Sequence, residues 1–318
     1  MNFINLGPIG TKEDGDLKGA FHLNGNHFMI HENAIYEIEP IENVKQSNLP
    51  KFIHRLIINQ GTNHPIVGQT IFQALQLVKS NFIDSKIDKS QLLNISLEIL
   101  QEAKVLEQEV ESYCALEKKL IQTDIENKGN SIPSIRDVTT RCKTVFQKAH
   151  HIQLLINNII LLFYPKLIDY KADYKTFLIN VSEINPTDSV LFEKIKSWST
   201  SMNLIREMRN KLDHLNTNQV SVKDFYFDSE KDPRGLYIMR PSIKLDSKKA
   251  KLTRTDLSKV FPNTIYTIIS VYQDTLAFLI NENLPADLNL TVNEIPEAER
   301  ENKWVKYGFL SAQGKVYI

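Results

Sequence analysis

The chain has 318 residues, of which 42% are hydrophobic and 24% are charged, and this composition is typical of a globular protein and excludes a disordered or collagen-like chain. Basic and acidic residues both number 38, so the formal net charge is zero. That balance argues against a general nucleic-acid coat protein, although a small local basic cleft stays possible. The two cysteines, Cys114 and Cys142, are too few for a four-thiolate zinc site and indicate no disulfide framework.

The longest apolar stretch, Ile152–Tyr164, is interrupted by Gln153 and by two asparagines, and it stops at Pro165. A membrane-spanning helix needs about 18 or more consecutive apolar residues, so no membrane partner is expected. Met1–Gly10 has no basic segment followed by an apolar core, which predicts no secretion signal. The expected location is therefore the cytoplasm.

The first 50 residues differ from the rest because they alternate and carry turn signals. Asn24-Gly25-Asn26 is a turn signal, flanked by Ala20–Leu23 and His27–Ile30, and Ala34–Ile38 then alternates between apolar and polar residues. Such a pattern predicts a short antiparallel meander.

Helical periodicity dominates from residue 65 onward. The expected helices are Ile66–Asn81, Lys89–Thr123, Ile135–Tyr164, a short one at Tyr170–Val181, Asp188–Leu215 and Thr255–Asn281. The helix at Asp188–Leu215 is the best defined, because its apolar residues recur every three or four positions and form one continuous stripe. Thr187 or Asp188 is its expected N-cap.

Two further regions read as strands. Val222–Phe227 and Leu236–Leu245 flank a polar loop and predict a hairpin. Trp304–Ile318 predicts one or two short strands that pair with the N-terminal meander, after a polar connector at 283–302. We therefore expect a meander and linker at 1–64, a helical domain at 65–284 with the hairpin at about 221–245, and a C-terminal connector with short strands at 285–318.

Several motifs of known chemistry are missing from the sequence. It has no G-x-x-x-x-G-K-[ST] loop, no G-x-G-x-x-G turn, no G-x-S-x-G elbow and no H-E-x-x-H pair, which excludes the recognisable forms of NTPase, dinucleotide enzyme, serine hydrolase and zincin. His22 and His27 are expected on opposite faces of an extended strand. The neighbours His150 and His151 diverge by about 100° on a helix. No metal site and no cofactor is therefore predicted.

The most informative segment is Arg209-Asn210-Lys211-Leu212-Asp213-His214, which has the form R-N-x-x-x-H near the end of its helix. Asn210 and His214 are expected one above the other on the polar face, nearly opposite the apolar stripe. Arg209 and His214 are about 140° apart around the axis, so one helix does not hold them as a tight pair. From periodicity and spacing alone, a solvated helix end is the favoured interpretation of this segment.

The same segment resembles the R-x4-6-H motif of HEPN domains, in which a polar residue commonly follows the arginine. The resemblance covers roughly Pro65–Asn281 and implies an all-α module, in many cases a ribonuclease of toxin or antiviral defence systems, with the site formed across a homodimer. It implies that an RNA 2′-hydroxyl attacks the adjacent phosphorus without a metal, with Arg209, Asn210 and His214 as catalytic residues. His214 would be the general acid or base, Arg209 would bind the phosphate, and Asn210 would orient them.

With this resemblance, the expected fold is mainly α: a HEPN-like up-and-down helical bundle with a small N-terminal β meander and an inserted β hairpin. The expected function is that of a metal-independent endoribonuclease of toxin or phage-defence type. RNA is the expected substrate, with Arg206 and Lys211 as RNA-binding residues, and an antitoxin or other defence protein is a possible partner. The alternatives are a non-catalytic HEPN-like interaction or scaffold protein and a regulator whose meander binds a ligand.

Overall fold

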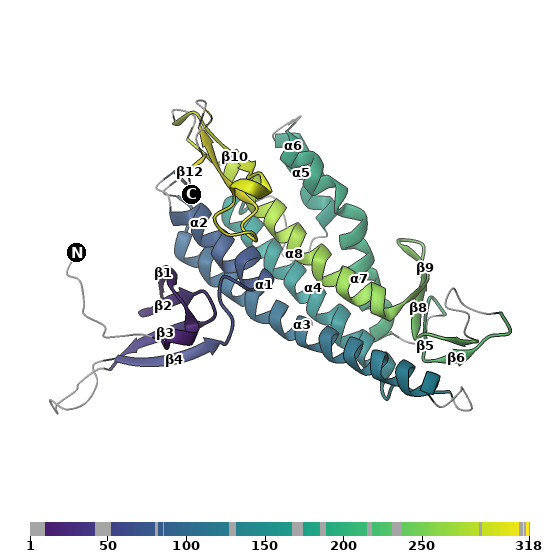
Figure 1. The fold of residues 1–318 in the computed structure, drawn as a ribbon. Coiled ribbons are helices and arrows are strands. Elements are labelled where there is room, and N and C mark those ends of the chain that lie inside the picture. The colour runs from purple at the N-terminus through teal and green to yellow at the C-terminus, as the bar shows by residue number, and fades with distance from the viewer. Residues whose placement is uncertain are drawn as a thin grey trace. The chain divides into compact units, whose positions relative to one another are not determined.

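A computed structural model describes residues 10–41, 52–79, 82–84, 86–126, 132–166, 174–184, 189–214, 218–230, 237–285, 288–311, 314 and 316–317. Its contacts divide the chain into two compact units (Figure 1). Unit 1 comprises residues 1–100 and 273–318, and unit 2 comprises residues 101–272. Both ends of the chain therefore belong to the same unit.

The N-terminal part of unit 1 confirms the antiparallel meander predicted over Ala20–Ile38 and adds to it a strand that was not expected, Phe52–Ile58. Its strands are β1 (Leu17–Leu23), β2 (Asn26–His31), β3 (Ile35–Pro40) and β4 (Phe52–Ile58), paired in that order. Asn24 and Gly25 join β1 to β2 with φ angles of 51° and 88°. Two consecutive positive φ angles give the tight turn whose twist matches the flanking strands, and glycine adopts one of them without strain.

The C-terminal part of unit 1 forms a separate sheet. It contains β10 (Leu290–Glu294), β11 (Tyr307–Ser311) and β12 (Val316–Tyr317), with β11 in the middle. The expectation that the tail strands pair with the meander is therefore wrong. Their partner β10 lies inside the expected connector, where its polar residues hide the strand pattern.

In the sequence, a continuous helix made of three segments follows the N-terminal sheet of unit 1. It runs through α1 (Pro65–Val67), a π-helical segment (Gly68–Phe72) and α2 (Gln73–Lys79), as the periodicity predicted. A Cβ atom added to Gly68 would lie 2.5 Å from the Cβ of Trp304. Only glycine allows this helix to approach the C-terminal segment this closely.

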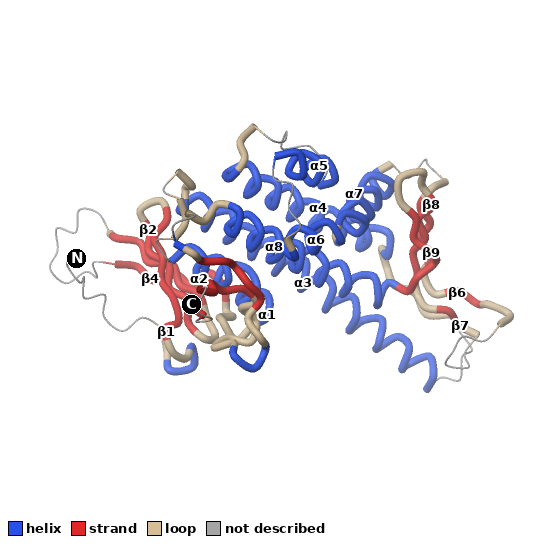
Figure 2. Tube along the Cα trace, turned by 90° about the horizontal axis from the view of Figure 1, so that it is seen from above, coloured by secondary structure: helices blue, strands red, loops and turns tan. Residues whose placement is uncertain are grey.

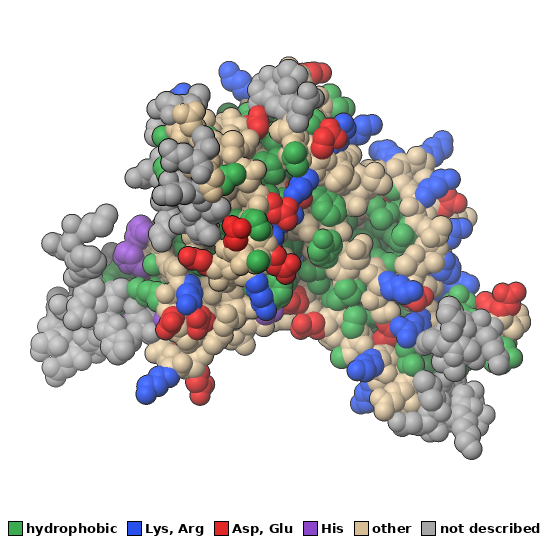
Figure 3. Space-filling view, turned by 45° about the horizontal axis from the view of Figure 1, so that its top comes forward, with side chains coloured by type: hydrophobic (Ala, Val, Ile, Leu, Met, Phe, Trp, Pro, Cys, Tyr) green, Lys and Arg blue, Asp and Glu red, His purple; other side chains and the backbone are tan. Residues whose placement is uncertain are grey.

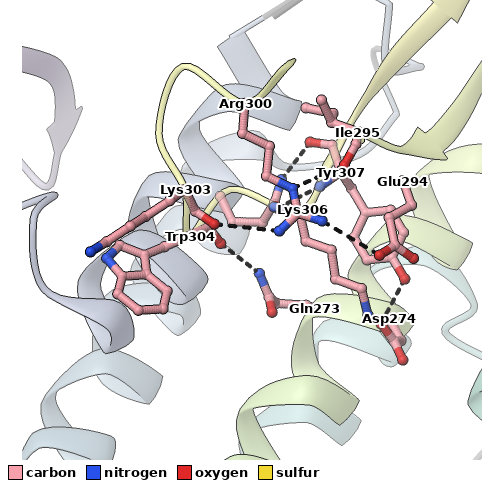
Figure 4. Close-up of polar contacts among 10 residues, drawn as sticks. Gln273, Asp274, Glu294, Ile295, Arg300, Lys303, Trp304, Lys306 and Tyr307 are labelled. Atoms are coloured by element: carbon pink, nitrogen blue, oxygen red, sulfur yellow. Dashed lines mark hydrogen bonds and ion pairs between the residues drawn. The ribbon is translucent and has the colours of Figure 1, made fainter. Parts of the chain in front are cut away.

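A buried polar network joins α2, the C-terminal sheet and α8 (Leu257–Glu282) within unit 1. Figure 4 shows its contacts between α8 and the C-terminal segment. Asp274 Oδ1 accepts hydrogen bonds from Lys306 Nζ at 2.8 Å and from the Tyr307 hydroxyl at 2.7 Å. The side chain of Gln73 accepts from the Lys306 and Tyr307 amides at 2.7 and 2.9 Å and donates to the Tyr307 carbonyl at 2.9 Å. Burial, followed by the Asp274 charge, raises the pKa of the Tyr307 hydroxyl.

Unit 2 is built mainly from helices. They are α3 (Lys89–Glu126) and α8, each of which begins or ends in unit 1, together with α4 (Val138–Phe163), α5 (Tyr174–Ile184), α6 (Val190–Ser197) and α7 (Ser199–Asp213). Both α4 and α5 pack against α7 (Figure 2). The predicted long helices at Lys89–Thr123, Ile135–Tyr164 and Thr255–Asn281 are confirmed within a few residues at their ends.

The predicted helix Asp188–Leu215 is wrong as a single element. Trp198 separates α6 from α7. Ser189 is the N-cap of α6, since its side chain accepts from the Phe192 amide at 3.1 Å. The expected caps Thr187 and Asp188, and Leu215, lie outside the described residues. The apolar stripe continues across the break, which explains why periodicity alone did not detect it.

Short strands complete unit 2. The sheet β5-β8-β9 comprises β5 (Val220–Lys223), β8 (Ser242–Asp246) and β9 (Lys251–Asp256), and β6 (Tyr226–Phe227) pairs with β7 (Ile238–Met239). These pairings confirm the predicted hairpin, whose loop at 231–236 lies outside the described residues. In contrast, β9 was not expected, since its last two residues were assigned to the following helix.

The expected fold class, a mainly α HEPN-like up-and-down bundle with two small β additions, is wrong. Of the described residues, 55% are helical and 21% are in strands, and the strands form four small sheets mixed with the helices along the chain. The reason is that β9 has a single apolar residue, Leu252, and that the alternation over Leu290–Asn293 in β10 is too short to stand out within the polar connector. Among the described helices, none is long and apolar enough to span a membrane.

Candidate functional site: the face of α4 and α7

The R-N-x-x-x-H segment lies on the last turn of α7, in unit 2. Arg209 Nε lies 3.2 Å from Asp213 Oδ2, and Arg209 Nη1 donates to Asn210 Oδ1 at 3.1 Å. The guanidinium therefore lies along the surface of α7, where it contacts the side chains of Asp213 and Asn210. Two of its five N–H donors are engaged in these contacts, which leaves donor capacity for a phosphate.

His214 lies just beyond the helix. The helix ends at Asp213, and His214 is the C-cap residue, whose amide donates to the Asn210 carbonyl at 3.3 Å. Its residue is exposed, so the imidazole is accessible to a ligand or to a second copy of the chain. The backbone of His214 is not helical, so the angular relation expected between Asn210 and His214 on an ideal helix does not apply to it.

The packing of α4 against α7 brings a second histidine, His150, to this face. Burial is the largest cause that lowers the pKa of His150 to about 4, and the charges of Arg209, Arg206 and His151 lower it further, against an opposing effect of Asp213. At neutral pH its imidazole is therefore uncharged and able to accept a proton. Gln147, one turn earlier on α4, donates to Asp213 Oδ1 at 2.9 Å and links the two helices.

Sequence reasoning assigned no role to His150, because it considered the histidine pair only within its own helix. His151 does diverge from it and approaches Glu102 of α3, with 3.4 Å between Nδ1 and Oε1. His150 lies among polar and basic residues on the first half of α4, so no local signal in the sequence distinguishes it. Two residues were expected to bind RNA. The charge of Arg206 contributes to the lowered pKa of His150. Lys211 lies half-buried on the same helix, α7.

A cavity of about 450 Å³ opens beside the N-terminal half of α7, entirely within unit 2. It is lined by Gln153, Tyr174, Lys175, Ser199, Thr200, Asn203, Arg206, Glu207 and Lys249. Gln153 is 2% exposed, and its Oε1 atom has no hydrogen-bond partner among the described residues. Buried polar atoms are nearly always paired, so this oxygen marks a place where a ligand donor fits.

Basic side chains gather on the β8–β9 hairpin next to this cavity (Figure 3). On the hairpin they are Lys244, Lys248, Lys249, Lys251 and Arg254, and Lys259 follows on the first turn of α8. Lys251 and Lys259 lie 3.6 and 3.7 Å from the carboxylates of Asp246 and Asp256. The excess of the other basic residues makes this a local positive surface on a chain without net charge, and such a surface attracts phosphates.

The histidines of the meander behave differently from expectation. His22 and His27 face each other across the β1–β2 hairpin, with ring centroids 4.7 Å apart, although an unpaired strand would point them apart. His31 instead bonds the Gly15 carbonyl at 3.1 Å. Within the described residues, no group of three or more histidine, cysteine, aspartate or glutamate side chains is arranged to hold a metal ion.

Comparison of the chain with protein-family models, with curated proteins and with solved structures gives no match.

Proposed function

We propose that this chain is a metal-independent endoribonuclease whose site lies on the α4–α7 face. The single observation that carries the proposal is the neutral imidazole of His150 beside Arg206 and Arg209. A neutral base next to two phosphate-binding cations is the combination that transfer at a phosphodiester needs. The resemblance of Arg209–His214 to the HEPN ribonuclease motif supports the same chemistry, although the fold is not the expected helical bundle.

In the proposed reaction, His150 removes the proton of an RNA 2′-hydroxyl, and the oxygen attacks the adjacent phosphorus. The bond from phosphorus to the 5′-oxygen breaks, and His214 donates a proton to the leaving oxygen, so that a 2′,3′-cyclic phosphate and a 5′-hydroxyl form. Arg209 binds the negative charge that develops on the phosphate. The incoming phosphate also offsets the arginine charges, which raises the basicity of His150 once RNA is bound.

Two features support RNA as the substrate and a homodimer as the active form. The β8–β9 hairpin provides positive charge for an RNA backbone. His214 is exposed at the end of α7, so an equivalent His214 from a second copy can complete a site by two-fold symmetry. The proposal implies a cytoplasmic enzyme. A toxin or defence setting, with an antitoxin or other defence protein as partner, follows from the motif resemblance.

The experiment is incubation of the full chain with tRNA and with a defined single-stranded RNA in the presence of EDTA. We expect cleavage that leaves 2′,3′-cyclic phosphate ends and is abolished in His214→Ala and His150→Gln. His151→Ala is the matched control, since it removes the neighbouring histidine from the same helix and should leave cleavage unchanged. Loss of cleavage with EDTA that Mg²⁺ restores would contradict the mechanism. A purely monomeric chain by light scattering at micromolar concentration would contradict the composite site.

A second candidate is a non-catalytic interaction or scaffold protein. The contacts of Arg209 with Asp213 and Asn210 favour it, because a guanidinium already held by its own helix can act as a structural residue. This candidate predicts that His214→Ala and Arg209→Lys leave every RNA assay unchanged. The ribonuclease proposal predicts that both variants lose cleavage while keeping their melting temperatures.

A further inference from the structure

The cavity beside α7 has three chemically distinct parts. Lys175, Arg206 and Lys249 contribute positive charge, Glu207 contributes a carboxylate, and Gln153 contributes a buried amide. The volume of about 450 Å³ lies within the range of small-molecule sites, roughly 300 to 1,000 Å³. The question is which ligand class satisfies all three parts at once.

The amide of Gln153 indicates a ligand with a hydrogen-bond donor at its buried end. The residue is 2% exposed, comes from α4 and lines the cavity, and its Oε1 atom is unpartnered among the described residues. Leaving a buried acceptor unpaired is costly, so a ligand donor is favoured there. The exocyclic amino group of a nucleobase such as adenine is a donor of this kind.

The charged groups indicate that the rest of the ligand is anionic and carries hydroxyl groups. Arg206 belongs to α7, and Lys249 belongs to the turn between β8 and β9. The backbone carbonyl of Lys249 accepts a hydrogen bond from Asn203 Nδ2 at 2.7 Å. That bond ties the turn to α7 and positions the lysine. The carboxylate of Glu207 is 5% exposed and accepts from the Ser247 hydroxyl at 3.1 Å. Carboxylates in nucleotide sites bind ribose hydroxyls in the same manner.

We propose that this cavity binds a nucleotide, with its base against Gln153, its ribose beside Glu207 and its phosphate on Arg206, Lys175 and Lys249. The nucleotide is either a free molecule or one unit of an RNA strand, because both present the same groups. The cavity shares Arg206 with the proposed ribonuclease site, whereas Gln153, Glu207 and Lys249 have no part in the proposed reaction, so variants of these three residues test the cavity by itself.

The test is calorimetric titration of the full chain with AMP, with inorganic phosphate and with a short adenine-containing single-stranded RNA. We expect AMP or the RNA to bind, and binding to weaken roughly tenfold or more in Gln153→Met and in Lys249→Gln. Gln147→Met on α4 and Lys223→Gln on β5, in the same sheet as β8 and β9, are matched controls outside the cavity and should bind AMP like wild type. The surface variant Lys249→Gln keeps the test decisive if Gln153→Met does not fold.

The outcomes separate the sources and the two proposals. Binding of AMP alone supports a free nucleotide, and cavity-dependent binding of the RNA alone supports a nucleotide unit of a strand. Inorganic phosphate that binds as tightly as AMP overturns the role of Gln153, and no binding of AMP or RNA overturns the site. His214→Ala should bind AMP like wild type, so a failed ribonuclease assay and a failed nucleotide site are distinguishable.

Discussion

The two units differ in how the hydrogen bonds of a buried glutamine side chain are satisfied. In unit 1, Gln73 makes three hydrogen bonds to the backbone of Lys306 and Tyr307, and Asp274 receives the ammonium of Lys306 and the hydroxyl of Tyr307. In unit 2, Gln153 is equally buried beside an open cavity, with one amide atom unpartnered among the described residues.

The difference separates structural polar groups from candidate functional ones. A paired buried network stabilises one arrangement of the elements that it joins, and removal of one member leaves the others unsatisfied. An unpaired buried acceptor beside a cavity lowers stability in the ligand-free protein, and a ligand can recover that loss. Stability measurements can therefore distinguish the two kinds of residue before any ligand is known.

The largest expected effect is on Asp274. Asp274→Ala leaves the Lys306 ammonium without its carboxylate in a mostly buried place, and breaking such a pair lowers the free energy of unfolding by about 3 kcal/mol. Urea unfolding of the full chain measures this loss. Asp246→Ala is the control, because it removes an exposed carboxylate from Lys251 and should cost within about 0.5 kcal/mol. Equal effects of the two variants would show that the network is not structural.

A smaller effect is expected at Tyr307. Tyr307→Phe removes one hydrogen bond to Asp274 and keeps the ring in place, so the loss should be about 1 kcal/mol. The double variant with Asp274→Ala should lose less than the sum of the two single losses, since the bond is shared. Strict additivity in the urea midpoints would contradict coupling within the network.

The pH dependence of unit 2 provides the next prediction. The pKa of His150 is about 4 in the folded chain and about 6.5 in the unfolded chain. Between pH 4 and pH 6.5, the unfolded chain therefore binds up to about one more proton than the folded chain does. This contribution to stability is complete above pH 6.5 and is lost as the pH falls toward 4. His150→Gln should lose less stability over that window, as measured by urea unfolding at several pH values. Parallel curves for the two proteins would rule out the lowered pKa.

The smallest change in stability is expected at Gln153, where a substitution should leave the free energy of unfolding unchanged or raise it. Gln153→Met replaces an unpaired buried amide with an apolar side chain of similar length, so stability should stay within about 1 kcal/mol of wild type or rise. The melting temperature without ligand checks this. A loss as large as that of Asp274→Ala would mean that the amide is paired in solution and that the contrast between the units is wrong.

Local signals predicted much of the secondary structure, because they depend on residues near one another in the chain. The Asn24-Gly25 turn set the register of the meander, and the three-and-four spacing marked α3, α4 and α8. The R-N-x-x-x-H motif predicted candidate site residues at the end of α7. The same periodicity missed the break at Trp198, since the apolar stripe continues through it. It also missed β9, which has one apolar residue, and β10, whose alternation is only a few residues long inside a polar segment.

The amino-acid sequence by itself therefore determined the helices, the meander and the position of a polar motif on an amphipathic helix, because backbone preference and residue spacing are local properties. Only the tertiary structure decided which strands pair, that His150 is neutral beside Arg206 and Arg209, and that Gln153 lies in the wall of a cavity. These properties depend on burial and on charges contributed by other helices. A polar residue inside an apolar helix indicates that something must satisfy it, but only packing shows whether a neighbouring side chain does so or a ligand is required.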